Sequence, residues 1–397
     1  QDQVFSYWNE LNNDEKKSLL DDLKDIDFEQ LHMLFNSVEK AEASDYSPAP
    51  YIPLPKTMDE MNTYEEAKTI GISKIKDGKL AAFLVAGGQG SRLGFDGPKG
   101  KFPVGPVTNK TLFQIHGEKI LKYSKKYDTS IPWLIMTSHA NHAETVSYFK
   151  ENNFFGINKE DVMIFPQNMI PSLDSQGNLI LQNKNSIFKN PDGHGGSLTA
   201  LYTSGSLEKL KERGIEIISY FQVDNPLVKI LDPVFIGFHV KNQADISSKA
   251  LKKAYAGEKV GVFVQFNDKK FGVMEYSDLP DEKANATDEQ GNLLYSSGSI
   301  AIHLFNRTFI EIVTAKNDIS LPFHTAKKKI KAFKNGSIEE IDGFKYEKFV
   351  FDALPLTERN IIFETLREEE FAPVKNAAGV DSVETSQELM MNLHRKW

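Results

Sequence analysis

The sequence predicts an α/β fold with a doubly wound, mostly parallel, Rossmann-like sheet, an N-terminal helical extension and an antiparallel insertion. From about Leu80, short apolar runs alternate with stretches of helical periodicity, which is typical of β-α-β units with right-handed crossovers. The apolar runs are LAAFLVA at 80–86, WLIMT at 133–137, VMIFP at 162–166 and IEIISYFQV at 215–223. Ligands of such sheets bind beyond the carboxyl ends of the strands, so the loops after these runs are candidate sites.

The flanking regions have other patterns. Apolar residues recur at helical spacing through 19–35, after Asn13 or Asp14 as a helix cap. Four prolines within SPAPYIPLPK favour an extended strap. Two apolar runs around NDKK, followed by GSIAIHLF, indicate a hairpin and an antiparallel extension within 258–305. We therefore expect a helical unit with its strap at 1–56, a sheet core at 57–370 and the start of a C-terminal unit at 371–397, where an apolar helical pattern is cut off as in a truncated chain.

Composition excludes several classes of function. The 397 residues carry a net charge of −8, which argues against a broad nucleic-acid or anionic-membrane surface. Because there is no cysteine, disulfides, thiolate catalysis and thiolate metal sites are impossible. No apolar run approaches the ~20 residues of a membrane span, and the first residues lack the apolar core of a signal peptide. We expect a soluble, cytoplasmic protein; no protein partner can be inferred.

The most informative segment is LVAGGQGSRLGFDGPKGKFPVG, at 84–105, directly after the first apolar run. Glycines at 87, 88 and 90 let a backbone approach a nucleotide and present N–H groups to phosphate. Arg92 offers a planar fork of donors and Lys99 a compact charge, and both kinds of cation hold phosphates. Glycine content alone would fit a surface turn equally well, but the two cations in one short loop favour phosphate binding. The loop is neither a Walker A motif nor a dinucleotide-binding GxGxxG motif.

These motifs resemble those of the eukaryotic UDP-N-acetylhexosamine pyrophosphorylases. AGGQGSRLG and PKG are followed, in that family's order, by PQNMIPSLDSQGNL, PDGHGG, QVDNPLVKILDPVFIGFH, GVMEYS, EKFVFD and FAPVKN. The resemblance covers most of the chain and implies the nucleotidyltransferase version of the Rossmann-like fold, with the antiparallel insertion on the sugar side. UDP-glucose pyrophosphorylases are similar in plan but usually lack the arginine after the glycines.

Carried over residue by residue, the resemblance implies three groups of contacts. The catalytic cations would be Arg92 and Lys99. Nucleotide contacts would come from Val85, Ala86, Gly87, Gly88, Gln167, Gly193, Asp224 and Lys345, with the uracil read by Gln167 and Gly193. The sugar side would be contacted by His194, Glu275, Tyr276, Ser299 and Lys375.

Several of these residues also fit ordinary structural roles. A side-chain amide can read a pyrimidine edge, but Gln167 alone would more often cap a loop. Asp224 follows a strand, where a carboxylate can hold Mg²⁺ against phosphate oxygens or cap a helix. Glu275 can accept from sugar hydroxyls, whereas Lys345 and Lys375 alone would more often be surface charges.

The chain departs from the family pattern at two sugar-side positions. His194 and Ser299 stand where the family commonly has asparagine. The sugar is therefore less firmly implied than the reaction, and His194 is expected to be a contact rather than a general base.

The resemblance implies transfer of a uridylyl group from UTP to N-acetylglucosamine 1-phosphate, with Mg²⁺ as cofactor and pyrophosphate as by-product. One alternative is a UDP-glucose or broad UDP-sugar pyrophosphorylase. Another is a non-catalytic regulator that binds sugar nucleotides, although a mere binder has no need of Arg92 and Lys99 together. A glycosyltransferase would lack PKG and release UDP.

Overall fold

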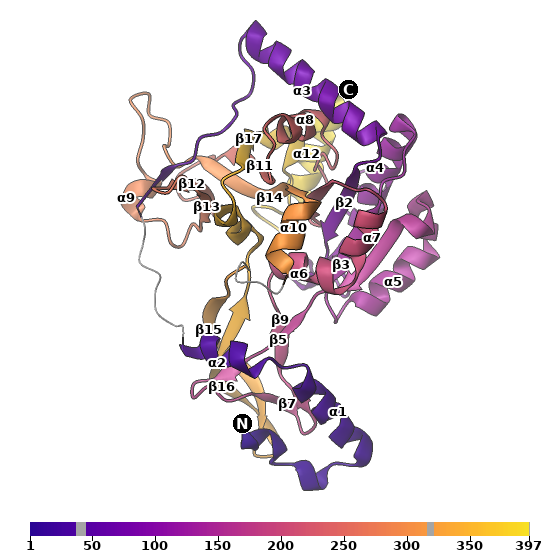
Figure 1. Ribbon diagram of the computed structural model, residues 1–397, viewed down its shortest axis with the longest axis vertical. Helices are drawn as coiled ribbons and strands as arrows, with labels where there is room; N and C mark the ends of the chain where they lie inside the picture. Colours follow the sequence, from indigo (N-terminus) through magenta and orange to yellow (C-terminus); the bar gives the residue numbers. More distant parts are fainter. Residues whose placement is uncertain (37–44, 316–320, 397) are drawn as a thin grey trace. The chain divides into compact units, whose positions relative to one another are not determined.

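The computed structural model describes residues 1–36, 45–315 and 321–396, which form two compact units (Figure 1). The larger, here called the sheet unit, consists of Ser44–Pro166, Ala200–Ser320 and Phe351–Trp397. The smaller, here called the hairpin unit, consists of Gln1–Ala43, Gln167–Thr199 and Leu321–Val350. These boundaries differ from those expected at 56 and 370, because two segments from the middle of the chain join the N-terminal residues. Three consecutive folding domains stay a prediction.

Four parallel strands form the centre of the sheet unit. Their spatial order is β10 (Ile217–Gln222), β2 (Leu80–Val85), β3 (Trp133–Thr137) and β4 (Val162–Pro166). Each is an apolar run, as a strand covered on both faces must be. The expected α/β, doubly wound fold is confirmed for this part of the chain.

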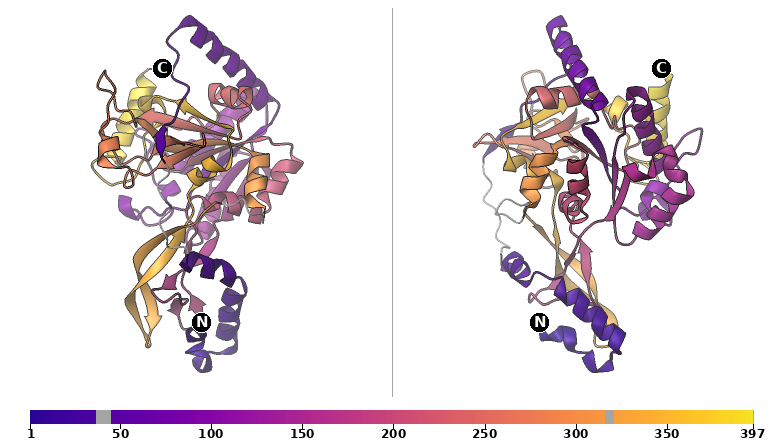
Figure 2. Two further views of the ribbon diagram at one scale, coloured as in Figure 1. Left: turned by 60° about the vertical axis from the view of Figure 1, so that its left-hand side comes forward. Right: turned by 45° about the vertical axis from the view of Figure 1, so that its right-hand side comes forward.

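Helices cover both faces of this sheet (Figures 1 and 2). Alternate side chains of the strands join one core with α3 (Met58–Lys76), α4 (Leu112–Tyr127), α5 (His142–Glu151) and α8 (Pro233–Lys241). Helices α7 (Ser206–Glu212) and α10 (Arg307–Thr314) pack together on the other side. α3 and α8 can approach closely because Gly237 has no side chain. A Cβ at this position would lie 1.7 Å from the Ala67 carbonyl oxygen.

An antiparallel part continues the same sheet. β14 (Ser297–Asn306) pairs antiparallel with β10, β11 (Ile246–Lys252) and β12 (Val262–Phe266). β12 forms the expected hairpin with β13 (Phe271–Met274) and also pairs with β1 (Tyr46–Pro48), at the start of the proline-rich strap. β17 (Asn360–Glu364) runs parallel to β11. The antiparallel extension expected within 258–305 is therefore present.

The hairpin unit combines the N-terminal helices with a long hairpin. Helices α1 (Asn13–Lys24) and α2 (Phe28–Asn36) contribute Leu19 and Leu31 to its core. Strands β15 (His324–Lys334) and β16 (Ser337–Glu347) pair over their whole length, and β16 also pairs with β6 (Leu173–Asp174). The short strands are β5 (Met169–Pro171), β7 (Leu181–Asn183), β8 (Ser186–Ile187) and β9 (Lys189–Pro191).

The remaining helices are short, apart from the last. They are α6 (Gly196–Thr203), α9 (Asp281–Ala284), α11 (Arg367–Glu370) and α12 (Val383–Arg395), with 3-10 turns at Asp2–Phe5, Trp8–Glu10, Ser91–Leu93, Lys99–Lys101, Asn153–Gly156, Lys159–Asp161 and Val350–Leu356. The cap of α1 is Asn12, in a capping box with Glu15, so the prediction of Asn13 or Asp14 is wrong by one or two positions. Within the described ranges, no helix is both long and apolar enough to cross a bilayer.

Candidate active site

The glycine-rich loop after β2 is closed by its own backbone. The Gly90 N–H donates to the Gly97 carbonyl at 2.9 Å, and the Lys99 N–H donates to the Gly88 carbonyl at 3.0 Å. Gly88 itself is exposed, and a Cβ built there would meet only the Lys99 side chain, at 4.0 Å. The loop is thus a rigid frame whose outer backbone is free to approach a ligand.

The base of the loop is tied to both neighbouring strands. The Val223 N–H donates to the Val85 carbonyl at 3.1 Å, and the Ala86 N–H donates to the Met136 carbonyl at 2.8 Å. The buried Asn141 amide also donates to the Ala86 carbonyl at 3.0 Å. Asn141 was not predicted from the sequence, because an amide before a helix usually reads as a cap.

The two predicted cations of the loop differ in their surroundings. Arg92 is exposed, and the described part of the chain offers it no ion pair. The Lys99 ammonium lies 3.4 Å from Asp224 Oδ2, and both side chains are mostly buried. The structure therefore brings together two residues that lie on the loops after β2 and β10. The glycine of PKG has a packing role, since a Cβ at Gly100 would lie 2.2 Å from the Phe113 ring.

Asp224 lines a pocket whose residues all belong to the sheet unit. Its backbone carbonyl accepts from the Val374 N–H at 2.9 Å, which joins the loop after β10 to the segment after α11. The pocket, here called the Asp224 pocket, is lined by Gln222, Asp224, Asn225, Lys259, Val260, Gly261, Ser299, Ile300, Ala301, Ile302, Phe371, Pro373 and Lys375. Three predicted site residues, Asp224, Ser299 and Lys375, thus lie around one cavity.

A bulge in β14 shapes one wall of this pocket. Pairing with β11 shifts between Ser248 and Ala250, and Ala301 adopts a φ of 54°. A left-handed non-glycine residue costs about 1 kcal/mol or more and persists only where the surroundings impose it. The Ser299 N–H donates to the Gly261 carbonyl at 2.8 Å, so the bulged strand is held at the pocket edge. Bulges commonly redirect side chains beside sites.

Polar side chains bind the backbone beside the loop that follows β10. The Asn225 amide donates to the Glu370 carbonyl at 2.8 Å and accepts from the Ala372 N–H at 3.1 Å. The Lys119 ammonium donates to the carbonyls of Pro226 and Val228 at 2.5 and 2.9 Å. Burial lowers the pKa of Lys119 to about 7, and the charge of Glu370 opposes this shift.

These supporting residues were missed at the sequence level. The only signal for Asn225 was its place beside Asp224 in QVDN, and Lys119 lies within an ordinary helical pattern in α4. Their partners are backbone groups more than 100 residues away along the chain, which no local pattern reveals.

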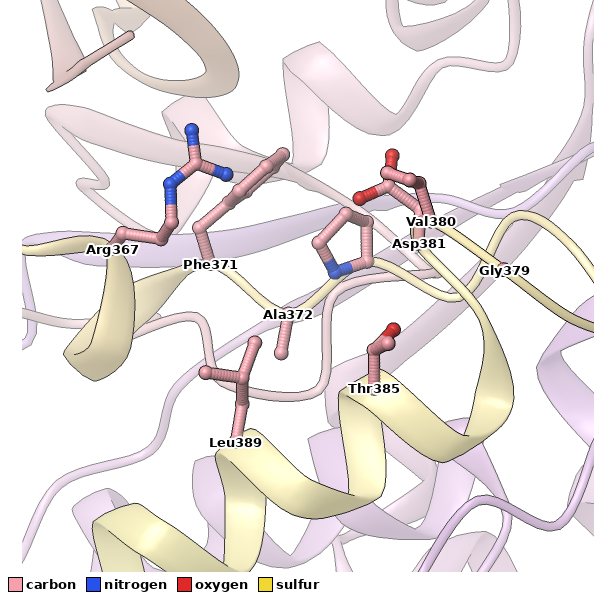
Figure 3. Close-up of a pocket in the computed structure, with 9 residues that line it drawn as sticks. Arg367, Phe371, Ala372, Gly379, Val380, Asp381, Thr385 and Leu389 are labelled. Carbon is pink, nitrogen blue, oxygen red and sulfur yellow. The ribbon is translucent and has the colours of Figure 1, made fainter. Parts of the chain in front are cut away.

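Lys375 forms an ion pair with a residue that is not part of the lining of the Asp224 pocket. Its ammonium lies 3.0 Å from Asp381 Oδ2, and Asp381 lines a second, largely apolar pocket beside α12 (Figure 3). Phe371 and Pro373 line both pockets, so the short segment between α11 and α12 forms a shared wall.

Lys259 is a further cation of the Asp224 pocket that the sequence did not suggest. It is exposed and has no ion pair among the residues described. Residues on both sides of it are held in place. The Glu258 carboxylate accepts from the Ala254 N–H at 2.7 Å and pairs with Arg367, and the Gly261 carbonyl accepts from the Ser299 N–H.

Of the predicted sugar-side pair, Glu275 lies at the margin of the pocket. A Cβ at Gly261 would be 3.2 Å from Glu275 Oε1. Tyr276, the second residue after β13, is 48% exposed. Neither residue belongs to the pocket lining.

The hairpin unit holds the other predicted residues: Gln167, Gly193, His194 and Lys345. Gln167 and Gly193 are brought together, because the Gln167 amide donates to the Gly193 carbonyl at 2.6 Å. His194 Nδ1 accepts from the Val350 N–H at 3.2 Å, and its ring stacks on Phe349. Lys345 lies on β16, where its ammonium is 5.7 Å from the centre of the Phe188 ring.

Across the described ranges, no three His, Asp or Glu residues gather in a group that could hold a metal ion. Asp224 is a single carboxylate in this pocket, whose lining also includes the oxygen-bearing residues Gln222 and Ser299, whereas the Asn225 side-chain oxygen already accepts from the Ala372 N–H. Magnesium usually keeps several waters and needs only one or two carboxylates beside substrate phosphates, so this oxygen donor set fits such an ion.

The chain is similar to known proteins over most of its length. The family described as UTP–glucose-1-phosphate uridylyltransferase matches residues 28–394. UDP-N-acetylglucosamine diphosphorylase 2 of Arabidopsis thaliana is 36% identical over 420 residues, which cover 100% of this chain and 82% of the relative.

Two solved structures are also similar. The uridine diphosphate N-acetylglucosamine pyrophosphorylase of Trypanosoma brucei has a TM-score of 0.87 and 28% identity, with 100% of this chain and 83% of that one covered. A protein of Entamoeba histolytica, titled as a UDP-N-acetylglucosamine pyrophosphorylase, has a TM-score of 0.77 and 34% identity, with 87% of this chain and 89% of that one covered. Because the family matches nearly the whole chain and the relative of 36% identity covers all of it, the chain belongs to the UTP–glucose-1-phosphate uridylyltransferase family.

Proposed function

We propose that this protein transfers a uridylyl group from UTP to N-acetylglucosamine 1-phosphate, giving UDP-N-acetylglucosamine and pyrophosphate. The observation that carries the proposal is the meeting of Lys99 with Asp224 beside the pocket that Ser299 and Lys375 line. A cation and a carboxylate at the carboxyl ends of adjacent parallel strands suit a phosphate and its metal ion.

In the proposed reaction, an oxygen of the sugar 1-phosphate attacks the α-phosphorus of UTP. The bond from that phosphorus to the bridging oxygen breaks, and pyrophosphate leaves in line with the attack. Because the attacking phosphate oxygen is already an anion, no general base is required. The work of the chain is then to align the two substrates and neutralise their charge.

The surroundings of each cation suggest which phosphate it contacts. Arg92, which is exposed and without an ion pair in the described residues, is free to form two parallel hydrogen bonds to the departing phosphates. Lys99 is held beside Asp224 and would contact the α-phosphate region. Lys375 and Lys345 are proposed to bind the sugar phosphate and the nucleotide phosphate, as in the family pattern.

Asp224 is the residue that we propose holds a divalent cation, with Mg²⁺ as the candidate. Such an ion, when bound, neutralises phosphate charge and orients the phosphates. The Lys99 ammonium, 3.4 Å from Asp224 Oδ2, also offsets the charge of this mostly buried carboxylate.

The acetylated sugar is proposed on the names of the relatives, not on the pocket lining. His194 and Ser299 replace residues that are commonly asparagine in the family pattern, and both substitutes can still donate and accept hydrogen bonds. UDP-glucose pyrophosphorylase activity is the competing proposal within the same family. Cytoplasmic location stays a prediction from the sequence.

The experiment is to follow pyrophosphate release with each of four nucleoside triphosphates and four sugar 1-phosphates, in the presence of Mg²⁺. We expect UTP with N-acetylglucosamine 1-phosphate to give the highest kcat/KM. Faster turnover of glucose 1-phosphate would support the competing activity. Release with none of the pairs would support a non-catalytic regulator. A separate incubation with a UDP-sugar alone tests glycosyl transfer, which would release UDP.

A further inference from the structure

The side-chain amide of Gln167 is held by two acceptors in the hairpin unit. Its Nε2 donates to Asp192 Oδ1 at 3.0 Å and to the Gly193 carbonyl oxygen at 2.6 Å. Gln167 is only 6% exposed. Because a carboxylate and a carbonyl can only accept, the nitrogen must face both of them, and the orientation of the amide is fixed by chemistry.

Asp192 is itself fixed by the packing of its loop. It is 5% exposed, its carbonyl accepts from the Lys348 N–H at 2.8 Å, and a Cβ at Gly196 would lie 1.9 Å from its Oδ1. Gly193 has a φ of 81° and lies so close to Lys348 that a Cβ would be 2.4 Å from the Lys348 carbonyl oxygen. The carboxylate therefore cannot move away from Gln167 without disturbing the backbone around it.

Both amide hydrogens of Gln167 are occupied by these two bonds, which leaves the oxygen Oε1 as the only group it can offer a ligand. Oε1 has no hydrogen-bond partner in the described part of the chain. Oε1 is not among the buried side-chain atoms that lack a partner, so water or a ligand can reach it. A ligand that donates a hydrogen bond replaces that water, whereas a ligand that presents an acceptor leaves both groups without a partner.

We propose that Asp192 is a positioning residue that holds the Gln167 amide with its oxygen presented to the base, so that the site selects uracil against cytosine. This inference rests on the proposed function, in which Gln167 reads the base. Uracil carries a hydrogen on N3 and can donate to Oε1, whereas N3 of cytosine is an acceptor and faces Oε1 with a second lone pair. Thymine shares the N3–H of uracil and is not excluded by this contact.

The test is a double-mutant cycle with isosteric variants, read out by calorimetric binding of UDP and CDP at pH 8. Wild type should bind UDP about 10- to 100-fold more tightly than CDP, the selectivity of one unmet hydrogen bond. Asp192→Asn should keep this preference within about threefold, because the asparagine oxygen can still accept from Gln167. Gln167→Glu should weaken UDP binding at least tenfold, since the new carboxylate faces two acceptors.

In the double variant Gln167→Glu/Asp192→Asn, the asparagine amide can donate to the glutamate, so UDP binding should recover at least threefold. Gln176→Glu adds the same charge on an exposed residue of the same unit and should leave UDP and CDP binding unchanged. Purely additive effects of the two changes at 167 and 192 would overturn the role of Asp192. Equal binding of UDP and CDP by the wild type would overturn the selection of uracil.

Gln167→Met provides a second variant that does not rely on the behaviour of a new charge. It has similar length and no hydrogen-bonding amide, so the UDP preference should fall to about twofold or less. An unchanged preference would also overturn the proposal. Binding is measured separately from pyrophosphate release, so absent catalysis with intact UDP selectivity would count against the proposed function alone.

Discussion

The two glycine-rich loops of the chain, 86–100 in the sheet unit and 191–196 in the hairpin unit, are held in different ways. The first is closed by its own backbone hydrogen bonds and keeps Gly88 exposed and Arg92 free of ion pairs within the described ranges. In the second loop a Cβ at Gly193, Gly195 or Gly196 would overlap a neighbouring residue, whereas the first loop is packed this tightly at Gly90 and Gly100 but leaves room at Gly88. The first loop therefore suits charge compensation on phosphates by its exposed backbone and the Arg92 side chain, and the second suits fixed reading of a base.

The largest effect that we expect is on the turnover rate when Arg92 of the first loop is replaced. Arg92→Ala should lower kcat about 100-fold or more, roughly 3 kcal/mol, because the guanidinium meets charge that grows on the departing phosphates. UTP affinity should fall by much less, and Arg92→Lys should recover only part of the rate. Kinetic constants and melting temperatures would be measured for both variants.

If Arg92 only held the loop, alanine would lower the melting temperature and raise KM while leaving kcat almost intact. Its exposure and lack of an ion pair among described residues argue for an unchanged melting temperature. Unchanged kcat at saturating substrates would remove Arg92 from the catalytic group.

The second prediction concerns stability and is a matched pair of glycine substitutions. Gly196→Ala should lower the free energy of unfolding by roughly 1–3 kcal/mol, because its Cβ would overlap the Asp192 carboxylate. Gly88→Ala has room for its Cβ and should cost less than about 0.5 kcal/mol, while it weakens UTP binding by blocking the backbone. Denaturant unfolding and UTP titration measure both. Equal losses of stability in the two variants would contradict the difference between the loops.

Much of the fold was readable from the sequence, because the parallel strands are continuous apolar runs and the glycine loop follows one of them directly. The N-terminal cap was misassigned by one or two residues, since three consecutive candidates in NND share the same chemistry. The composition of the hairpin unit was not predicted at all. It is assembled from segments such as β6 and β16, whose pairing of Gly343 with Asp174 joins residues far apart in sequence.

The candidate site was predicted mainly through its motifs. Asp224 and Lys99 follow strands, and that position already indicated ligand binding. Three further residues were missed because no local sequence pattern marks them. Asn141 and Lys119 bind backbone groups that are distant in sequence, and Lys259 was found only because it lines the pocket.

The third prediction uses pH to probe the packed loop. Burial raises the pKa of Asp192 to about 6 from an ordinary value of 3.8, although the Gln167 hydrogen bond and the Lys348 charge oppose the shift. The folded state therefore binds this proton more tightly than the unfolded state. The stabilisation is fully present below about pH 4 and is lost as pH rises through about 6.

Other carboxylates also respond to acid, so the measurement is the difference between wild type and Asp192→Asn. The free energy of unfolding of wild type, relative to the variant, should increase by about 2 kcal/mol between pH 7.5 and pH 4. If the difference does not change with pH, then folding does not raise the pKa of Asp192.

The fourth prediction compares one distal lysine from each unit. Lys345→Ala and Lys375→Ala should each lower kcat/KM by roughly tenfold, the scale of one charged contact to phosphate, with little loss of stability. Lys328→Ala, on the strand paired with that of Lys345, serves as a matched surface control. Kinetics of both variants equal to those of the control would remove the two lysines from the proposed site.

The smallest effect is expected at Lys259, the cation of the Asp224 pocket that the sequence did not suggest. The pocket already contains Lys375, whose ammonium shares its charge with Asp381, so a second lysine without an ion pair in the described residues adds attraction for a doubly charged sugar phosphate. Exposure weakens that attraction, because water and salt screen the charge within about 10 Å at 0.1 M ionic strength. We therefore expect Lys259→Ala to raise KM for the sugar 1-phosphate about threefold with kcat nearly unchanged, and Lys259→Glu to raise it further.

Both changes in KM should shrink as salt is added. Lys252→Ala removes a lysine of comparable exposure that lies outside the pocket lining and should leave KM unchanged. If Lys259→Ala behaves like that control, or if its effect does not depend on salt, Lys259 takes no part in attracting the sugar phosphate, and the charge of Lys375 alone supplies that side of the pocket.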